Sequence, residues 1–269
     1  MKYPIFQLDA FTNRLFGGNP AAVVILERWL CLLYTSDDQV LQAIAAENNL
    51  AETAFVIPAG EPIPLRWFTP TIEVDLCGHA TLAAAQALFA HYFTDRTRLS
   101  FATRSGTLEV FRDEPRLFLD FPSRPGTPRP LDERLVNVLG LQPVEAVQAR
   151  DLLVAVSSER EVREFVPDFA AIESLDTFAL ILTAPGEQVD FVSRFFAPAA
   201  GVPEDPVTGS AHCTLIPYWS RRLGKTTLRA RQISRRGGEL SCELRIAPGG
   251  DRVLIGGEVV EYLRGEITV

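Results

Sequence analysis

The chain has 269 residues, of which 47% are hydrophobic and 22% are charged, a composition typical of a folded globular protein. Its formal net charge of −8 argues against a nucleic-acid-binding surface, which needs a basic field, and no stretch is apolar for long enough to cross a membrane. The four cysteines form no C-x-x-C pair and the three histidines do not join them at metal-ligand spacing, so a reduced, cytoplasmic protein without structural zinc is expected.

The N-terminal region is predicted to contain two strands and a helix. Residues 5–11 read as a strand that follows the first four residues directly, so no signal peptide is expected. A turn at 17–20 leads to a second, buried strand at 21–26. The capping-box spacing of Ser36 and Gln39 predicts a helix that runs to about residue 49. The apolar run from Cys31 to Tyr34 stands where a polar connection is expected, and its conformation is left open.

A carboxylate interrupts the apolar strand predicted at residues 50–57. Strict alternation places Ala54 and Val56 on the same face as Glu52 and points Phe55 the other way. Two interpretations of Glu52 stay open at this point. It is either an edge-exposed or Lys/Arg-paired glutamate, or a desolvated glutamate with a raised pKa that is suited to proton transfer.

The next predicted unit is a strand at residues 65–68, a turn, and an Ala- and Leu-rich helix that Gly78 opens. The first backbone N–H groups of a helix have no partner inside it, and with the helix dipole they favour a carboxylate or phosphate there. His79 lies in the first turn, in reach of such an anion. Cys77 is either a nucleophile, with a pKa lowered by the helix N-terminus, or a buried apolar filler.

The remaining elements are predicted from the same signals. An antiparallel meander of three strands is expected between residues 99 and 121, followed by a proline-rich linker at 122–130. Helices are expected at 131–139, 159–165 and 211–223, and Pro217 should kink or restart the last of them. Further strands are expected at 152–156, 178–182 and 191–196, and near 228, 240 and 253–260.

The sequence also repeats itself over about half its length. Residues 66–70 and 194–198 read alike at an offset of 128, and residues 78–82 and 209–215 at an offset of 131. Gly106 and Gly237 keep the offset of 131. Two copies are too few for a solenoid, so we expect two similar halves that face each other and aim two helix N-termini at one cleft. The halves are assigned to residues 1–122 and 131–269, with the extreme C-terminus free to pack back on the N-terminal half.

The richest polar cluster, residues 201–212, lies at the second of these turns. Pro206 forces an extended conformation on Asp205, which in isolation reads as a cap for the following helix. Its position in the repeat, opposite His79, predicts instead that a carboxylate, an imidazole and a hydroxyl converge with Glu52. Such a set supports acid–base chemistry without a metal or an organic cofactor. His212 is expected one turn into the helix, packed or supporting the site.

These motifs resemble the PhzF family, the phenazine-biosynthesis-like isomerases. The resemblance is carried by residues 9–12, 18–23, 49–55, 76–81 and 204–212, in family order across nearly the whole chain. It implies an α+β, diaminopimelate-epimerase-like fold of two pseudo-symmetric halves, each a mixed β-barrel-like sheet around a central helix. It also implies that Glu52 is the general acid/base. Ala51 stands where relatives usually have Ser, and the run from Cys31 to Tyr34 departs from their polar connection.

The same resemblance assigns the remaining site residues. His79 and Asp205 match catalytic polar groups around the substrate, and Ser210 matches a group that binds it. Gly78 and Gly209 match the backbone positions at the two helix starts. The family further implies a homodimer, a small anionic metabolite as substrate, and proton transfer at carbon that ends in isomerisation, double-bond migration or epimerisation.

Two other functions are weighed against this one. A two-cysteine epimerase on the same fold would use Cys77 as one of its two thiols. The second turn carries no thiol, and Cys213 comes after the helix has started. One thiol would then have to act as base and as acid on opposite faces of the substrate carbon. A non-catalytic binding protein on an old enzyme fold is the third hypothesis. The sequence does not identify the substrate.

Overall fold

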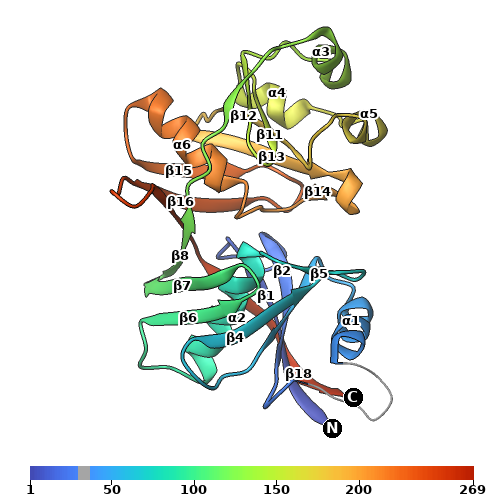
Figure 1. Ribbon diagram of the computed structural model, residues 1–269, viewed down its shortest axis with the longest axis vertical. Helices are drawn as coiled ribbons and strands as arrows, with labels where there is room; N and C mark the ends of the chain where they lie inside the picture. Colours follow the sequence, from blue (N-terminus) through green and yellow to red (C-terminus); the bar gives the residue numbers. More distant parts are fainter. Residues whose placement is uncertain (30–36) are drawn as a thin grey trace. The chain divides into compact units, whose positions relative to one another are not determined.

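The computed structural model describes residues 1–29 and 37–269, and these fall into two compact units. Unit 1 consists of residues 1–120 and 256–269, and unit 2 of residues 121–255. In Figure 1 unit 1 holds the blue and cyan elements with the red C-terminal strand, and unit 2 holds the yellow and orange ones. The segment from Cys31 to Tyr34, whose conformation the sequence leaves open, lies outside the described residues.

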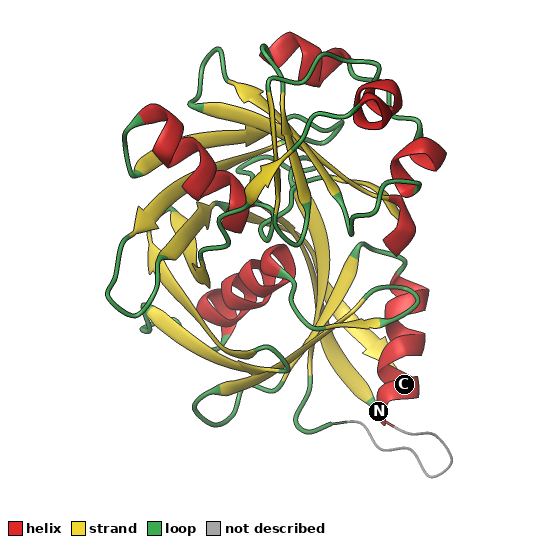
Figure 2. Cartoon of the chain, turned by 45° about the horizontal axis from the view of Figure 1, so that its top comes forward, coloured by secondary structure: helices red, strands yellow, loops and turns green. Residues whose placement is uncertain are grey.

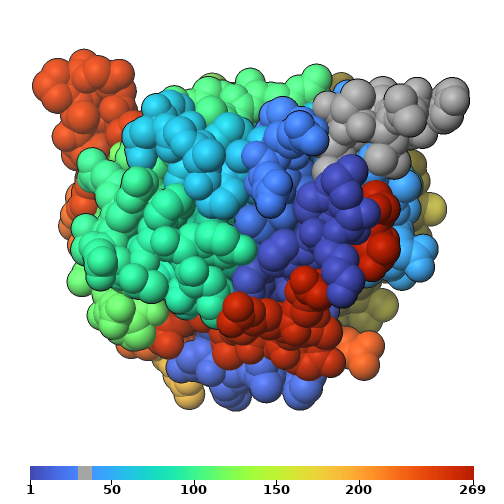
Figure 3. Space-filling model, turned by 90° about the horizontal axis from the view of Figure 1, so that it is seen from below, coloured from blue at the N-terminus to red at the C-terminus, as the bar shows by residue number. Residues whose placement is uncertain are grey.

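Unit 1 is built mainly of strands that pair both parallel and antiparallel. Its strands are β1 (Lys2–Ala10), β2 (Asn19–Ile25), β3 (Glu52–Val56), β4 (Ile63–Phe68), β5 (Glu73–Val74), β6 (Arg98–Thr103), β7 (Gly106–Asp113), β8 (Arg116–Pro122) and β18 (Val259–Thr268). β18, β1 and β2 pair antiparallel, β2 and β3 parallel, and β3 and β4 antiparallel. β4 pairs antiparallel with β5 and parallel with β6, and β6, β7 and β8 form the predicted meander. Figure 3 shows β18 in red at the surface beside β1 in blue.

Unit 1 contains the helices α1 (Asp37–Asn48) and α2 (Gly78–His91). The sequence predicts both. α1 ends where Asn49 takes a left-handed conformation, with φ of 48°, but Ser36 of the predicted capping box lies outside the described residues. Eleven of the fourteen residues of α2 are buried, because its small and apolar side chains leave no polar face for water. Figure 2 shows this helix enclosed by strands, so it forms the core of its unit.

The strands of unit 2 also pair in both parallel and antiparallel fashion, in a similar design. Its strands are β9 (Thr127–Arg129), β10 (Glu145–Gln148), β11 (Leu152–Ala155), β12 (Leu180–Pro185), β13 (Phe191–Ala197), β14 (Val202–Asp205), β15 (Thr227–Gln232), β16 (Gly238–Arg245) and β17 (Arg252–Gly257), through which the chain returns to unit 1. The helices are α3 (Glu133–Leu139), α4 (Glu159–Glu164), α5 (Phe169–Glu173), the short 3₁₀ helix η1 (Pro198–Ala200) and α6 (His212–Leu223).

The two units repeat one pattern of strand pairing. In unit 2, β9, β10 and β11 pair antiparallel, β11 and β12 parallel, β12 and β13 antiparallel, β13 and β15 parallel, and β15 and β16 antiparallel. This is the order found for β18, β1, β2, β3, β4, β6 and β7. Gly106 and Gly237 stand at the same hairpin of each unit with φ of 96° and 66°, a conformation that glycine adopts without strain. The sequence repeat is therefore a repeat of topology.

Three details of the sequence-based description are corrected. Residues 122–130 are not merely a linker, because Thr127–Arg129 form β9 and pair with β10. α6 runs as one helix through Pro217 rather than restarting there. His212 is the first residue of α6 and does not lie a turn inside it. The expected α+β fold is confirmed. Within the described ranges, none of the helices has both the length and the apolar character that crossing a bilayer demands.

Candidate active site

The start of α2 places a histidine beside a glutamate. Glu52 is the first residue of β3, and its neighbour across the parallel pairing is Ala21 of β2. His79 is the second residue of α2. Nε2 of His79 lies 3.1 Å from Oε2 of Glu52, with side-chain exposures of 5% and 17%. A carboxylate and an imidazole at this distance, largely shielded from water, form a pair that can exchange a proton.

A third residue, which the sequence analysis does not single out, completes the pair. Asn19 begins β2 and is fully buried, and its Nδ2 lies 3.2 Å from Nδ1 of His79. In the neutral form of His79 the amide donates this hydrogen bond to Nδ1, and the ring proton stays on Nε2, which faces Glu52. The preceding Gly18 has φ of 60°, and a Cβ there would lie 2.1 Å from the Ala10 carbonyl oxygen. Only glycine fits this turn, which fixes where Asn19 enters the sheet.

Cys77 approaches His79 from the same side as Asn19. Its Sγ lies 3.5 Å from Nδ1 of His79, and its backbone forms the N-cap of α2 without a side-chain capping bond. Burial, followed by the negative charge of Glu52, raises the pKa of the Cys77 thiol to about 11. The thiol is therefore protonated at neutral pH, which argues against Cys77 as a resting thiolate nucleophile.

Burial and nearby negative charge have opposite effects on the pKa of His79. Burial by itself disfavours the imidazolium, but negative charge on Cys77 and Glu52 outweighs it, so the pKa of His79 is raised well above its ordinary value. At neutral pH the Cys77 thiol keeps its proton, so the Glu52 carboxylate is the negative charge that favours the imidazolium there. An imidazolium beside a carboxylate offers an acid and a base at one place.

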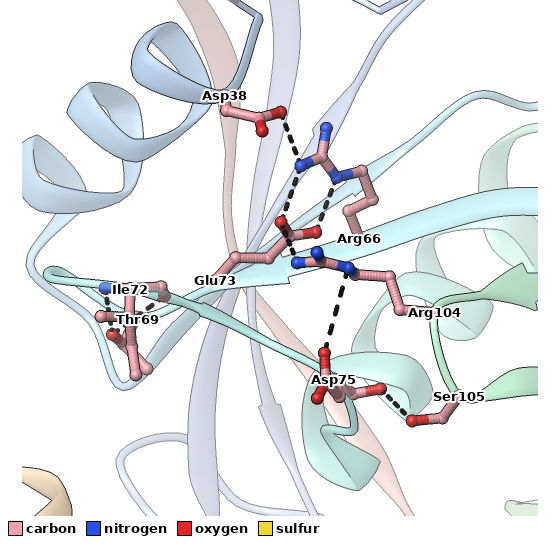
Figure 4. A network of polar contacts seen from close by, with 8 residues as sticks. All are labelled: Asp38, Arg66, Thr69, Ile72, Glu73, Asp75, Arg104 and Ser105. Atoms are coloured by element: carbon pink, nitrogen blue, oxygen red, sulfur yellow. Dashed lines mark hydrogen bonds and ion pairs between the residues drawn. The ribbon is translucent and has the colours of Figure 1, made fainter.

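A network of ion pairs holds the segment that leads into α2 (Figure 4). Arg66 of β4 binds both carboxylate oxygens of Glu73 at 2.7 Å, and Arg104 binds the same carboxylate at 2.6 Å. The hydroxyl of Ser105 donates to the backbone oxygen of Asp75 at 2.7 Å. Bidentate arginine–carboxylate contacts fix geometry as well as charge. They therefore position the chain just before Cys77.

Unit 2 repeats this arrangement before α6. Arg194 of β13 binds Glu204 of β14 through two contacts of 2.7 and 3.0 Å. The guanidinium carbon of Arg66 lies 5.1 Å from the ring centroid of Phe68, and that of Arg194 lies 4.9 Å from the ring of Phe196. The two glutamates stand 131 residues apart, the offset of the glycine turns, so the sequence repeat already contained this signal.

Asp205, the last residue of β14, is buried inside a hydrogen-bonded group. Thr208 donates its hydroxyl to the Asp205 carboxylate, and Nε2 of Gln232 donates to the Asp205 backbone oxygen at 2.7 Å. Oε1 of the same glutamine accepts the backbone N–H of Thr208 at 2.9 Å. The N-cap of α6 is Ala211, without a side-chain cap bond, so the simple interpretation of Asp205 as a helix cap is wrong.

Gly209 and Ser210 form the turn that precedes α6. The N–H of His212 bonds the oxygen of Gly209 at 3.0 Å, so the regular helix begins after the glycine rather than at it. A guanidinium nitrogen of Arg150 lies 3.5 Å from the hydroxyl oxygen of Ser210. The structure thus brings Glu52 together with His79 in unit 1, and it places Asp205 and Ser210 in separate contacts in unit 2.

His212 is fully buried against Phe191, with ring centroids 5.9 Å apart. Its Nδ1 lies 2.8 Å from the Thr208 backbone oxygen, so Nδ1 carries the proton and donates. Its Nε2 has no hydrogen-bond partner in the described part of the chain. Burial lowers the pKa of His212 to about 4, so this ring is neutral and packs rather than reacts. The expectation of a packed His212 is confirmed.

Comparison with known proteins identifies relatives of the whole chain. The family model described as phenazine biosynthesis-like protein, PhzC-PhzF, matches residues 8–265. A Pseudomonas aeruginosa protein named as an uncharacterized isomerase is 52% identical over 270 residues, covering all of both chains. A crystal structure of a PhzF family protein from Enterococcus faecalis has a TM-score of 0.94 at 46% identity, again over all of both chains.

More distant structures share the fold alone. A hydroxyproline epimerase from Agrobacterium vitis, solved with bound trans-4-hydroxy-L-proline, has a TM-score of 0.65 at 9% identity. The match covers 99% of this chain and 92% of the epimerase. The diaminopimelate-epimerase-like fold expected from the sequence is thereby supported, and identity this low carries no further conclusion.

Proposed function

The chain belongs to the PhzC-PhzF family of phenazine biosynthesis-like isomerases, and from this premise we propose that Glu52 and His79 transfer a proton at carbon of a small carboxylate-bearing metabolite. The contact of 3.1 Å between Nε2 of His79 and Oε2 of Glu52, at a largely buried position, is the observation that carries this proposal. The reaction needs no organic cofactor, because acid and base are both side chains of the protein.

The proposed binding mode follows from the start of α2. The first backbone N–H groups of this long, buried helix and its dipole attract the carboxylate of the substrate. The substrate carboxylate then makes a neighbouring C–H bond more acidic by drawing electron density away from it, since the helix stabilises the added charge.

The proposed proton transfer has two steps. The Glu52 carboxylate takes a proton from carbon, and the electron pair of the broken C–H bond delocalises into the substrate. The His79 imidazolium, or the protonated Glu52, then gives a proton to carbon at another position or on the other face. In the first case the product is a double-bond isomer, and in the second case an epimer. General acid–base groups of this kind contribute roughly 10²- to 10⁴-fold to a rate.

Residues of unit 2 enter this proposal through the family resemblance. Asp205 and Ser210 are proposed to contact the substrate, with Gly209 offering its backbone. The Asp205 carboxylate is held by the Thr208 hydroxyl, and the Gln232 side chain bonds the backbone oxygen of Asp205 and the backbone N–H of Thr208, which would keep the carboxylate in one orientation. A rigidly held polar group binds a small anion's hydroxyl or amino substituents at little entropic cost.

Deuterium exchange from solvent tests the proposal without a known substrate. The purified chain is incubated in D₂O with a panel of β,γ-unsaturated acids and α-amino acids, and NMR follows the loss of C–H signals. We expect wild type to exchange one class of acid and Glu52→Gln to lose at least about 100-fold in rate. Glu61→Gln, at an exposed glutamate paired with Arg96, is the matched control and should exchange normally.

Two results would contradict the proposal. Exchange by Glu52→Gln at the wild-type rate would remove Glu52 from the chemistry. Failure of wild type to exchange any acid would favour the non-catalytic hypothesis. The two-cysteine epimerase finds no support in the cysteine environments, since burial raises the pKa of Cys213 to about 12, close to the value for Cys77.

A further inference from the structure

Three different metal-ligand donors meet beside the start of α2. Glu52 offers a carboxylate oxygen, Cys77 a thiol sulfur and His79 an imidazole nitrogen, and these atoms all lie within 4.8 Å of one another. Among the described residues no other such group of three donors occurs. Cys77 and His79 are separated by one residue at a helix start, a spacing that matches no common metal motif, so the sequence alone gives no hint of it.

The distance between the thiol and the imidazole fits a bound zinc ion. Zn²⁺ binds sulfur at about 2.3 Å and nitrogen at about 2.0 Å, so two ligands at a tetrahedral angle stand about 3.5 Å apart. Sγ of Cys77 and Nδ1 of His79 are 3.5 Å apart. The pair therefore has the required separation without moving, and Zn²⁺ on Nδ1 would replace the hydrogen bond that this nitrogen receives from Asn19. Glu52 contacts the other ring nitrogen, Nε2, so it has to change a side-chain torsion to become the third ligand.

The surroundings of these donors favour a cation as well. Nε2 of His79 and Oε2 of Glu52 contact each other at 3.1 Å, and neither atom has a further hydrogen-bond partner among the described residues. His79 is 4% exposed and Cys77 is 6% exposed. A dication bound by a thiolate, a carboxylate and a neutral imidazole gives a cluster without net charge, which a buried position tolerates best. One sulfur, one nitrogen and one oxygen donor select Zn²⁺ over Mg²⁺ or Ca²⁺.

We propose that Cys77, His79 and Glu52 form a binding site for Zn²⁺, and that its occupation switches off the proton-transfer pair. The second part rests on the proposed function, and the first part does not. Bound Zn²⁺ takes the Nδ1 lone pair, so His79 can no longer become an imidazolium, and it withdraws negative charge from the Glu52 carboxylate, so that group becomes a weaker base. The fourth position of the ion stays open to water or to a substrate carboxylate, as in other three-ligand zinc sites.

Metal binding is measured directly on the full chain. The EDTA-treated protein is titrated with Zn²⁺ in competition with a coloured chelator, and with Co²⁺ while the thiolate-to-cobalt absorption is recorded. We expect one equivalent of metal with the cobalt–sulfur band in wild type. Cys77→Ser should lose the band and bind more than about 100-fold more weakly, because even the outer partners of metal ligands are worth about 10- to 100-fold.

Cys213→Ser is the matched control. Cys213 is also buried in the first turn of a helix, but it belongs to no group of three donors in the described structure. This variant should bind Zn²⁺ as tightly as wild type and show the same cobalt band. Absence of a one-equivalent site in wild type, or equal affinity in Cys77→Ser, would overturn the metal site.

A second readout tests the switch separately. In the deuterium-exchange assay, Zn²⁺ should suppress exchange by wild type and by Cys213→Ser, with recovery on adding EDTA. Cys77→Ser should keep its own metal-free rate when Zn²⁺ is added. One equivalent of bound Zn²⁺ with unchanged exchange would overturn the switch. If no acid is exchanged by any variant, the proposed function fails, and the titration still decides the metal site.

Discussion

Replacing His212 by Asn should make the stability of the protein less sensitive to acid. The folded protein keeps His212 neutral, with a pKa of about 4 against an ordinary value of 6.5, because burial disfavours the imidazolium. As the first residue of α6, it also faces the positive end of the helix dipole. The unfolded chain takes up a proton near the ordinary pKa, and the folded chain does not.

The sign and size follow from this difference in pKa. A lowered histidine pKa contributes stability that is complete above pH 6.5 and is lost as the pH falls toward 4. The slope reaches about 1.4 kcal/mol per pH unit, so the loss between about pH 7.5 and pH 5 is roughly 2 kcal/mol. In His212→Asn the amide can still donate to the Thr208 oxygen, which Nδ1 of His212 contacts at 2.8 Å in wild type.

Urea unfolding at several pH values gives the free energy of unfolding for both proteins. At about pH 7.5 wild type should be the more stable, since Asn fills less of the contact with Phe191. Its advantage should shrink by roughly 2 kcal/mol toward pH 5. If the difference between the two proteins stays constant over this range, His212 is not held neutral by burial and the reasoning fails.

Three further variants test the other contacts. His79→Asn should show the opposite pH dependence to His212→Asn, because a raised histidine pKa contributes stability that is complete below pH 6.5 and is lost as the pH rises. The free energy of unfolding of wild type should therefore exceed that of the variant most in acid. Urea unfolding with the reverse trend would contradict the pairing of His79 with Glu52. Asn19→Leu removes the 3.2 Å contact to Nδ1 of His79 and should cost roughly 1–3 kcal/mol of stability. It should also shift the pH profile of deuterium exchange. An unshifted profile would show that Asn19 contributes only to packing. Arg194→Met should destabilise the protein by roughly 3 kcal/mol, and adding Glu204→Gln should restore part of this loss in denaturant unfolding. If the loss in the double variant equals the sum of the losses in the two single variants, the pair is not coupled.

Much of the architecture could be predicted from the sequence because the signals are local. Apolar runs gave the strands, the Ala- and Leu-rich segment after Gly78 gave α2, and the helix at 131–139 was confirmed as α3 with Asp132 as its N-cap. The half-length repeat predicted two similar units, and strand pairing shows the same topology in both. Each of these features depends on residues close together in the chain or on simple self-similarity.

Contacts between distant residues depended on the tertiary structure. Asn19 and His79 are sixty residues apart, and they meet because β2 is the neighbour of β3 and lies against α2. A shift of one residue in the register of β2 would turn Asn19 to the other face of the sheet. No local pattern fixes such a register, so Asn19 was missed and the metal-ligand group of Cys77, His79 and Glu52 was invisible in the sequence.

The sequence by itself therefore determined the elements, the duplication and the family, because propensity, periodicity and motif spacing are properties of neighbouring residues. The tertiary structure alone decided the partners and charges of the side chains. It paired Glu52 with His79, kept the Cys77 thiol protonated and left His212 neutral. Protonation depends on burial and on nearby charges, and both are set only when distant segments of the chain pack together.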